Sequence, residues 1–384
     1  MQLFDNIERE YLGPADHNEP PYHFYQRSAR KDIKIIRDTL NDWFQDYPDS
    51  EKAEFRNSFK DHFYDCFFEL FLFRLFRQLG FEIEIHPEIP NSSKRPDFLI
   101  TKEDLEIYIE AKSVYDKSKE EEALERKINQ FYDNFSKIKL DGFMLSLNTF
   151  DLKSHRQPSS KAAIKYFEEK INQLDPDKLT EDANLNGTES LPSFEFENED
   201  LHIIVKILPL KPSARQKENN RPIGIYPGKS FWGGGEKALR NSIDSKARRY
   251  GKLDKPFIIC LNSHDIKMSG KEDVENAIWG SLAISWTDNP DDKDEKWVRQ
   301  KDGVFLNNNG PRLKNVSGVF VTKIFPHNIP IADYWLFEHP FTNNKLDFSK
   351  IGLIYSYVDK GKIYTNTIKD FERILNIPNN WLNG

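Results

Sequence analysis

The stretch PDFLITKEDLEIYIEAKS, residues 96–113, carries both the strand pattern and the charges that decide how this chain is interpreted. Two apolar runs are joined by the polar TKED turn, which predicts a β-hairpin. Side chains alternate along a strand, so Glu110 and Lys112 share one face of the second strand. An antiparallel return at the turn brings Asp97 beside Glu110. The hairpin therefore predicts that two carboxylates and an ammonium group converge.

A fourth charged residue precedes the hairpin. Glu69 lies inside CFFELFLFRLF, which is apolar on every side of a helix and so predicts a buried helix. A buried carboxylate must be paired, protonated or bound to metal. Adjacent carboxylates repel one another, and a divalent cation relieves the repulsion. Oxygen ligands without Cys or His favour Mg²⁺ or Mn²⁺ over zinc. Lys112 is then placed to activate water or to stabilise charge on a phosphate.

This pattern resembles the PD-(D/E)XK, or restriction-endonuclease-like, nuclease superfamily over about residues 55–150. The shared features are a helix with Glu69, a strand, a strand with Pro96-Asp97, a strand with Glu110-Ala111-Lys112, and then a helix and a strand. The resemblance implies catalytic roles for Asp97, Glu110, Lys112 and Glu69, and metal binding at Asp97, Glu110, Ala111 and Glu69. The alternative for Glu110 and Lys112 is a solvated strand face with a cross-strand salt bridge.

Residues that contact nucleic acid are expected mainly where Lys and Arg concentrate, in KPSARQKENNRP and RNSIDSKARRYGK. The alternative is a solvated helix face. YPGKS lacks the spacing of a phosphate-binding loop, because only three residues separate its glycine from the preceding one. Ser113 either contacts phosphate or ends its strand. The candidate contacts are Gln130, Ser113, Arg215, Lys217, Lys229, Arg240, Arg248 and Arg249.

Composition narrows the class of protein. The chain has 384 residues, 38% of them hydrophobic, and a net charge of −7, so bulk charge does not indicate a nucleic-acid partner. Its two cysteines lie in apolar runs and have no zinc or disulfide spacing, which fits a reducing cytoplasm. The N-terminus is acidic and mixed, unlike a signal peptide. The most apolar run is too short to cross a bilayer, so no membrane partner is expected.

The length predicts more than one domain within an α/β fold that has a restriction-endonuclease-like core, a mixed central sheet flanked by helices, and a second α/β region. One helix is expected over residues 51–80, with Gly80 as its cap. The second region is either a degenerate repeat of the first or similar to it by composition alone. The expected parts are a helical arm (1–50), the nuclease core (51–150), a helix and linker (151–195), the second α/β region (196–290) and a C-terminal α/β region of unknown role (291–384).

These expectations combine into a cytoplasmic, Mg²⁺- or Mn²⁺-dependent deoxyribonuclease. By family analogy alone, restriction or defence against foreign DNA is its setting, with DNA repair as the competitor. RNA is the alternative substrate, and a homodimer is considered because nucleases that cut both strands often dimerise. The alternative from another class is an inactive nuclease-like fold that binds nucleic acid or protein.

Overall fold

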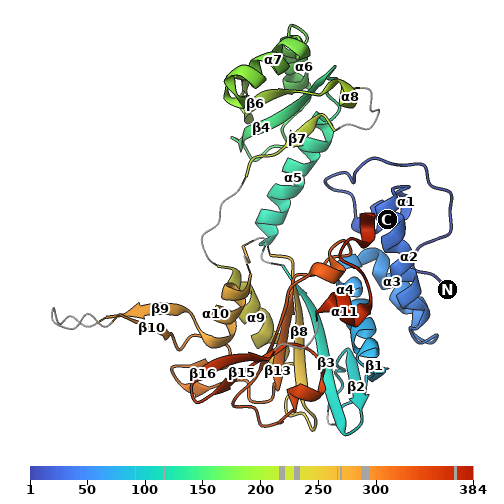
Figure 1. Ribbon diagram of the computed structural model, residues 1–384, viewed down its shortest axis with the longest axis vertical. Coiled ribbons are helices and arrows are strands. Elements are labelled where there is room, and N and C mark those ends of the chain that lie inside the picture. Colours follow the sequence, from blue (N-terminus) through green and yellow to red (C-terminus); the bar gives the residue numbers. More distant parts are fainter. Residues whose placement is uncertain are drawn as a thin grey trace. The chain divides into compact units, whose positions relative to one another are not determined.

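A computed structural model describes residues 1–90, 92–115, 117–215, 221–228, 234–265, 267–268, 270–286, 295–366 and 370–383 (Figure 1). The chain divides into two compact units, and each has its own sheet and core. Unit 1 comprises Met1–Ile7, Lys31–Asp116 and Phe231–Gly384. Unit 2 comprises Glu8–Arg30 and Lys117–Ser230. Unit 2 therefore interrupts the sequence of unit 1 twice.

Unit 1 is built on an eight-stranded mixed sheet. Its first three strands form an antiparallel meander, and the third, fourth and fifth strands in the sheet are parallel to one another. Beyond them the pairings are antiparallel, parallel and antiparallel. In sheet order the strands are β1 (Glu82–Ile85), β2 (Phe98–Lys102), β3 (Leu105–Val114), β8 (Phe257–Ser263), β13 (Gly318–Thr322), β14 (Tyr334–Glu338), β15 (Tyr355–Asp359) and β16 (Lys362–Asn366).

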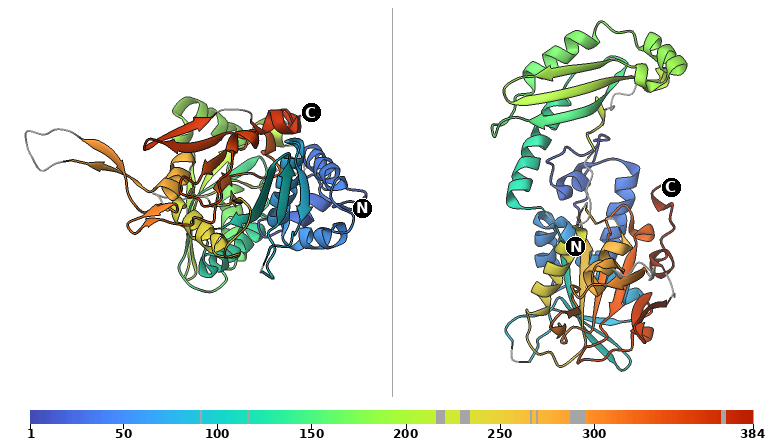
Figure 2. Two further views of the ribbon diagram at one scale, coloured as in Figure 1. Left: turned by 90° about the horizontal axis from the view of Figure 1, so that it is seen from below. Right: turned by 90° about the vertical axis from the view of Figure 1, so that its left-hand side faces the viewer.

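Helices cover this sheet. Helix α4 packs against β1 and β3, and α9 packs against β3 and β8 (Figure 2). All positions of β8 and β13 are buried, as expected for central parallel strands covered on both faces. This arrangement confirms the coarse α/β class. The helices of unit 1 are α2 (Lys31–Gln45), α3 (Lys52–Asp61), α4 (Phe63–Gln78), α9 (Gly235–Ala247), α10 (Lys271–Trp279) and α11 (Phe371–Leu375).

Smaller elements complete unit 1. They are the hairpin of β9 (Leu282–Ser285) and β10 (Lys296–Arg299), the pair β11 (Leu306–Asn307) and β12 (Gly310–Pro311), and the 3₁₀ turns Ile329–Ile331, Phe348–Lys350 and Trp381–Asn383.

The single helix expected over residues 51–80 is divided in two. His62 has φ −122° and ψ 51°, which is not helical, and it separates α3 from α4. After α4, Gly80 has φ +85°, the left-handed conformation that glycine adopts without strain, which confirms it as the residue that ends this helix.

Unit 2 contains a four-stranded sheet and its own apolar core. Apolar side chains of α5 and α6 pack with the inward residues of β4 and β6. In sheet order the strands are β5 (Ser193–Glu197), β6 (Leu201–Pro209), β4 (Phe143–Leu152) and β7 (Ile223–Ile225). The helices are α1 (Pro21–Arg27), α5 (Lys119–Phe135), α6 (Lys161–Ile171), α7 (Pro176–Asn186) and the short α8 (Pro212–Arg215), with a 3₁₀ turn at Thr188–Ser190.

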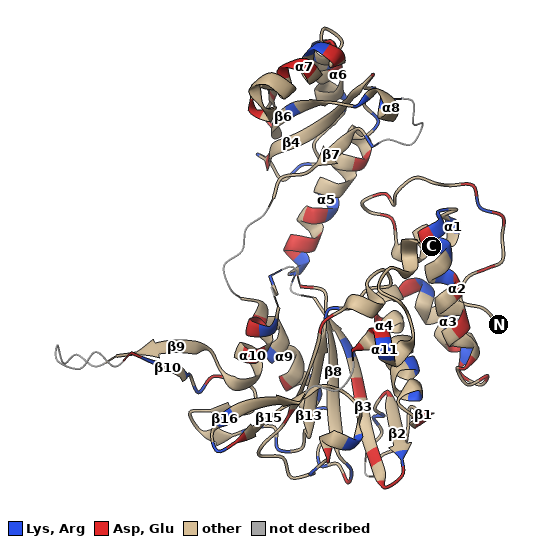
Figure 3. Cartoon of the chain, in the orientation of Figure 1, with Lys and Arg blue, Asp and Glu red and all other residues tan. Residues whose placement is uncertain are grey.

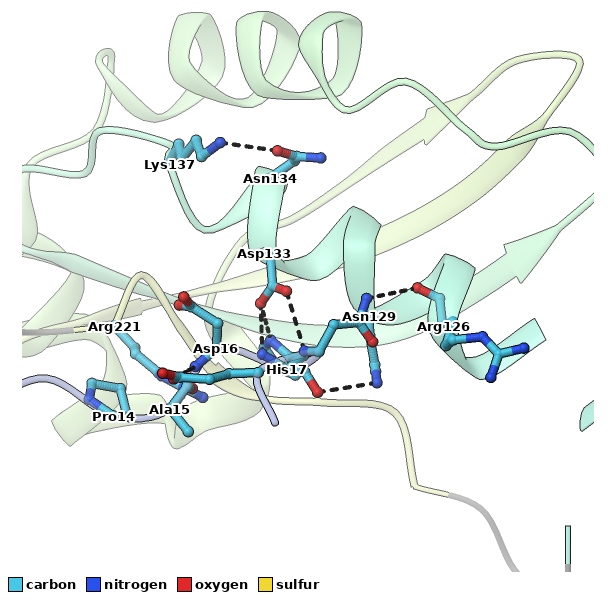
Figure 4. A network of polar contacts seen from close by, with 12 residues as sticks. Pro14, Ala15, Asp16, His17, Arg126, Asn129, Asp133, Asn134, Lys137 and Arg221 are labelled. Atoms are coloured by element: carbon cyan, nitrogen blue, oxygen red, sulfur yellow. Dashed lines mark hydrogen bonds and ion pairs between the residues drawn. The ribbon is translucent and has the colours of Figure 1, made fainter. Parts of the chain in front are cut away.

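Part of the N-terminal arm belongs to unit 2 because polar contacts hold it to α5 (Figure 4). Asp133 accepts hydrogen bonds from the backbone N–H of His17 at 2.8 Å and contacts the His17 ring Nδ1 at 2.7 Å. Asn129 donates to the His17 carbonyl at 3.4 Å, and Arg221 donates to the carbonyl of Ala15. Residues 1–50 are thus shared between the units, whereas the sequence predicted a single arm.

The remaining division also differs from the expected boundaries. Residues 117–150, expected in the nuclease core, lie in unit 2. Within the expected helix and linker (151–195), the polar stretch 175–190 is mostly α7. Pro176 occupies the first turn, and Asp175 caps the helix by accepting from the backbone N–H of Asp177 at 2.9 Å. Asp175 before Pro176 is a sequence signal for the start of a helix, and the prediction of a linker gave more weight to the polar composition of the segment.

The possible repeat rests on two similar segments, residues 109–151 and 225–265, each of which has Lys-Ser, then a helix, and then a strand that contains Leu-Asn. These segments do not form two similar folded units. In the first, β3 belongs to the sheet of unit 1 and β4 to that of unit 2. In the second, β7 belongs to unit 2 and β8 to unit 1. Residues 229–233 of the second segment lie outside the described residues.

Candidate active site

The β2–β3 hairpin has the register that the sequence predicts. Phe98 pairs with Ile109, so Asp97 lies opposite Glu110 in the antiparallel ladder. The Asp97 carboxylate accepts a hydrogen bond from the backbone N–H of Ala111 at 2.5 Å. Asp97 is therefore fixed beside the backbone that joins Glu110 to Lys112.

Glu110 is fully buried, with 0% of its surface exposed. Its Oε1 accepts from Lys246 Nζ and from Arg249 Nη1, the latter at 3.0 Å, and its Oε2 accepts from the Tyr250 hydroxyl. Lys246 lies in the last turn of α9, and the other two donors follow that helix. Two cations thus satisfy a buried carboxylate with charge-assisted hydrogen bonds.

Tyr250 connects Glu110 to the segment just before β2. Its hydroxyl also lies 3.0 Å from the carbonyl oxygen of Arg95, so one proton faces two acceptors. Burial, and then the charge of Glu110, raise the pKa of Tyr250 well above its ordinary value. Tyr250 therefore acts as a neutral donor.

Glu69 and Asp97 differ from Glu110 because they are half-buried, and no ion pair with Lys or Arg is found for either in the described part of the chain. Burial raises the pKa of Glu69, and the charges of Asp97, Asp65 and Glu110 raise it further. Burial and the charge of Glu110 likewise raise the pKa of Asp97, against the opposing hydrogen bond from Ala111. The raised pKa values favour retention of a proton by the pair, and a bound cation would oppose it.

Lys112 is half-buried and has no hydrogen bond or ion pair with any residue that the structure describes. Burial lowers its pKa, Lys246 lowers it further, and the charges of Asp65 and Glu110 oppose both effects. An unpaired lysine with a lowered pKa is suited to accept or position a proton.

Three residues of this cluster were not predicted as site residues: Asp65, Lys246 and Tyr250. Asp65 had a usable signal, because it precedes Glu69 by four residues on one helix and so shares its face. Lys246 and Tyr250 had none, since they reach Glu110 from 136 and 140 residues further along the chain.

The predicted nucleic-acid contacts have different surroundings. Arg249 lies in the cluster, where it binds Glu110. Ser113 is buried in β3. Arg240 donates to the Asn276 carbonyl at 2.8 Å and lies 3.3 Å from Asp302, so its charge is committed within unit 1. Arg248 is exposed, 3.5 Å from the Asp244 carboxylate.

Of the other four candidates, two lie in the described part of unit 2. Arg215, in unit 2, donates to the Leu210 carbonyl at 2.9 Å and to Asp177 at 2.7 Å. Gln130 is exposed on α5, a helix that carries both acidic and basic side chains (Figure 3). Lys217 and Lys229 lie outside the described residues.

The donor chemistry only partly fits a divalent cation. Glu69 and Asp97 offer oxygen ligands of the kind that Mg²⁺ and Mn²⁺ prefer, and a cation would relieve their repulsion. Glu110 does not fit as it stands, because both of its oxygens already accept hydrogen bonds. Among the described residues, no three His, Cys, Asp or Glu side chains are grouped as a metal site.

Comparison with protein-family models, with curated proteins and with solved structures finds no match to this chain. Within the described ranges, no helix combines the length and the apolar character needed to cross a bilayer.

Proposed function

We propose that the protein is a nuclease that uses a divalent metal ion to hydrolyse phosphodiester bonds in DNA. The observation that carries this proposal is the hairpin register, which sets Asp97 opposite Glu110 and against the backbone N–H of Ala111, between Glu110 and Lys112 in the strand. Glu69 on α4 is close enough for the charges of Asp97 and Glu110 to raise its pKa. Three carboxylates and an unpaired amine at one place suit chemistry on a phosphate.

The topology of unit 1 supports a restriction-endonuclease-like core. Helix α4, the meander β1–β2–β3, helix α9 and the parallel strand β8 follow the order of helix, three strands, helix and strand. On this proposal, unit 2 is an insertion between the strand that carries Glu110 and the next core helix. That helix is α9, whereas the sequence predicted α5.

Each residue of the cluster has a role on this proposal. Glu69 and Asp97 would hold Mg²⁺ or Mn²⁺, and Glu110 would join them only after one of its oxygens is released by α9. The bound cation would polarise the phosphoryl group and favour ionisation of a water molecule. Lys112 would accept the proton of the attacking water or stabilise charge on the phosphate.

A second function has one specific observation in its favour. Both Glu110 oxygens are held by α9 and the residues after it, which suits a nuclease-like fold that binds nucleic acid or protein without cutting. On that reading, the cations neutralise Glu110 permanently and the cluster is structural.

The deciding experiment is a cleavage assay with single- and double-stranded DNA and RNA, in Mg²⁺, Mn²⁺ or EDTA. We expect metal-dependent cleavage of DNA by the wild type and a loss of about 100-fold or more in Lys112→Ala. Lys102→Ala is the matched control, because Lys102 is also half-buried on this hairpin but donates to the Leu79 carbonyl at 2.9 Å. It should cut normally.

Three results would change the proposal. Normal cleavage by Lys112→Ala would show that the assigned site is wrong. Binding without cleavage in either metal would favour the binding module. Cleavage confined to RNA would replace DNA as the substrate.

A further inference from the structure

Aromatic side chains gather where the three parallel strands of unit 1 end. Tyr115 directly follows β3, His264 directly follows β8, and Phe325 comes shortly after β13. Tyr64 at the start of α4 and His327 join them. We call these five residues the aromatic shelf. In open α/β sheets, ligands bind outside the carboxyl ends of the parallel strands, and the shelf occupies that position.

The rings of the shelf are in mutual contact. Tyr115 stacks on His264, with ring centroids 4.8 Å apart and planes 18° apart. Phe325 meets His264 edge-on at 4.9 Å and stacks with His327 at 5.6 Å. Tyr64 lies 4.9 Å from His264 and 6.0 Å from Phe325. These contacts preorganise the ring orientations, which lowers the entropy cost of binding a further flat group.

The outer rings of the shelf are open to solvent. Tyr115 is 52% exposed although its inner face rests on His264, and His327 is exposed although it stacks on Phe325. These outer faces are therefore accessible to a further flat group. His264 is neutral at physiological pH, because burial lowers its pKa to about 4. The shelf therefore offers flat, uncharged ring faces.

The shelf adjoins the proposed catalytic cluster through Asp65, the neighbour of Tyr64 on α4. Burial, and then the charge of Asp65, raise the pKa of Tyr115. The same carboxylate opposes the lowering of the pKa of His264 and of Lys112 by burial. Asp65 also raises the pKa of Glu69, after burial and Asp97. Asp65 thus acts electrostatically both on two residues of the shelf, Tyr115 and His264, and on Glu69 and Lys112.

We propose that the aromatic shelf stacks unpaired bases of DNA and directs the nuclease to single-stranded segments or frayed ends. The inference rests on the proposed function. Stacking on aromatic rings is how sequence-tolerant proteins hold single strands, since every base has a flat face. In a duplex the base faces are covered by neighbouring pairs, so the shelf favours unpaired DNA.

The test is binding of a short single-stranded DNA with 2-aminopurine at one end, in EDTA. We expect quenching of the fluorescent base by the wild type, and about tenfold weaker binding with little quenching in Tyr115→Ala. Tyr115→Phe keeps the ring and should bind normally. Tyr364→Ala is the matched control, since Tyr364 in the edge strand β16 is also an exposed tyrosine stacked on a ring, 5.7 Å from Tyr357 in β15.

The result that overturns the shelf is single-strand binding by Tyr115→Ala and His327→Ala as tight as that of the wild type, with folding confirmed by circular dichroism. An equal loss of affinity for a blunt duplex would overturn the preference for unpaired DNA. Tighter, Tyr115-dependent binding of the same sequence as RNA would overturn the choice of DNA.

This test separates the shelf from the nuclease proposal because it needs no metal. Lys102→Ala, at a lysine outside the catalytic cluster, should bind the labelled strand normally. Ring-dependent binding by a wild type that cuts nothing supports the shelf and overturns the nuclease proposal. Metal-dependent cleavage without ring-dependent binding does the reverse.

Discussion

The cores of the two units differ in whether they bury charged side chains. In unit 1 the buried residues include Glu110, Asp265 and His339, whereas the buried polar residues described in unit 2 are Ser28 and Ser146. The contrast holds between single strands of equal length. The ten-residue strand β3 carries Glu110 and Lys112, and the ten-residue strand β4 carries Ser146 at its most buried polar position.

The buried charges of unit 1 indicate that the functional site lies in that unit. Burying a charge costs free energy even when it is paired, and an apolar replacement is often at least as stable. Unit 2 has the apolar core that stability favours. Unit 1 keeps Glu110 together with Glu69 and Asp97, whose pKa values its own fold raises. We therefore expect loss of charge in unit 1 to affect catalysis, and changes in unit 2 to affect stability alone.

The largest expected effect is on cleavage by Asp97→Asn. The amide removes a ligand charge and weakens the acceptor for Ala111, so the rate should fall about 100-fold or more. Single-turnover cleavage of DNA in Mg²⁺ measures it. Ser146→Ala is the counterpart in unit 2 and should cut normally. A wild-type rate in Asp97→Asn would exclude this carboxylate from the site.

The second effect is on stability. Lys246→Met should lower the free energy of unfolding by about 2–4 kcal/mol, because it leaves Glu110 buried with fewer partners. Denaturant titration measures the change. Lys206→Met is the control in unit 2, since each lysine is 16% exposed, but the Lys206 partner, Glu189, is 90% exposed. It should change stability by less than about 1 kcal/mol. Equal effects of the two variants would contradict the contrast.

The third effect is the pH dependence of stabilisation by Mg²⁺. Because the folded-state pKa values of Glu69 and Asp97 are raised, protonation stabilises the fold below their ordinary values, and this contribution is lost as pH rises through the raised values. Mg²⁺ competes with those protons. Excess Mg²⁺ should therefore add about 1 kcal/mol or more at about pH 8 and little at about pH 5.5.

Thermal unfolding with and without Mg²⁺ at the two pH values measures this effect. The double variant Glu69→Gln, Asp97→Asn has no such protons to displace and should lose both the Mg²⁺ effect and its pH dependence. An equal effect of Mg²⁺ at both pH values would argue against metal binding at these carboxylates.

The smallest expected effect is that of a substitution in unit 2, which should change the stability of the protein but not its cleavage of DNA. Asp175→Ala removes the cap of α7 and should cost about 1 kcal/mol, whereas Asp175→Asn should cost less because asparagine also caps helices. Urea unfolding measures both. DNA cleavage should be unchanged in both variants. A loss of cleavage in Asp175→Ala would assign unit 2 a part in the reaction.

Local patterns predicted the hairpin well. Alternation and the TKED turn suffice for the Asp97–Glu110 register, because both depend on residues close in sequence. Gly80 was predicted as the end of its helix for the same reason. The catalytic and metal-binding roles of Asp97, Glu110, Lys112, Glu69 and Ala111 stay predictions.

Long-range features were beyond these patterns. Helix α5 and strand β4 follow Lys112 in the chain and have the right periodicities, yet they build a second core. The choice between α5 and α9 as the neighbour of β3 depends on tertiary packing. The contacts of Lys246 and Tyr250 with Glu110 also depend on tertiary packing. In the sequence, these two residues lie in a charged helix end that has no distinguishing feature.

The insertion of unit 2 has a consequence for the order of biosynthesis. Glu110 leaves the ribosome well before Lys246, which lies 136 residues later in the chain. At about 5–20 residues per second, the delay is on the order of ten seconds. During that time unit 2 has nearly all of its sequence and can fold, while β3 lacks β8 and Glu110 lacks its cations. The growing chain can thus complete the core of unit 2 before the core of unit 1, in which Glu110 is buried.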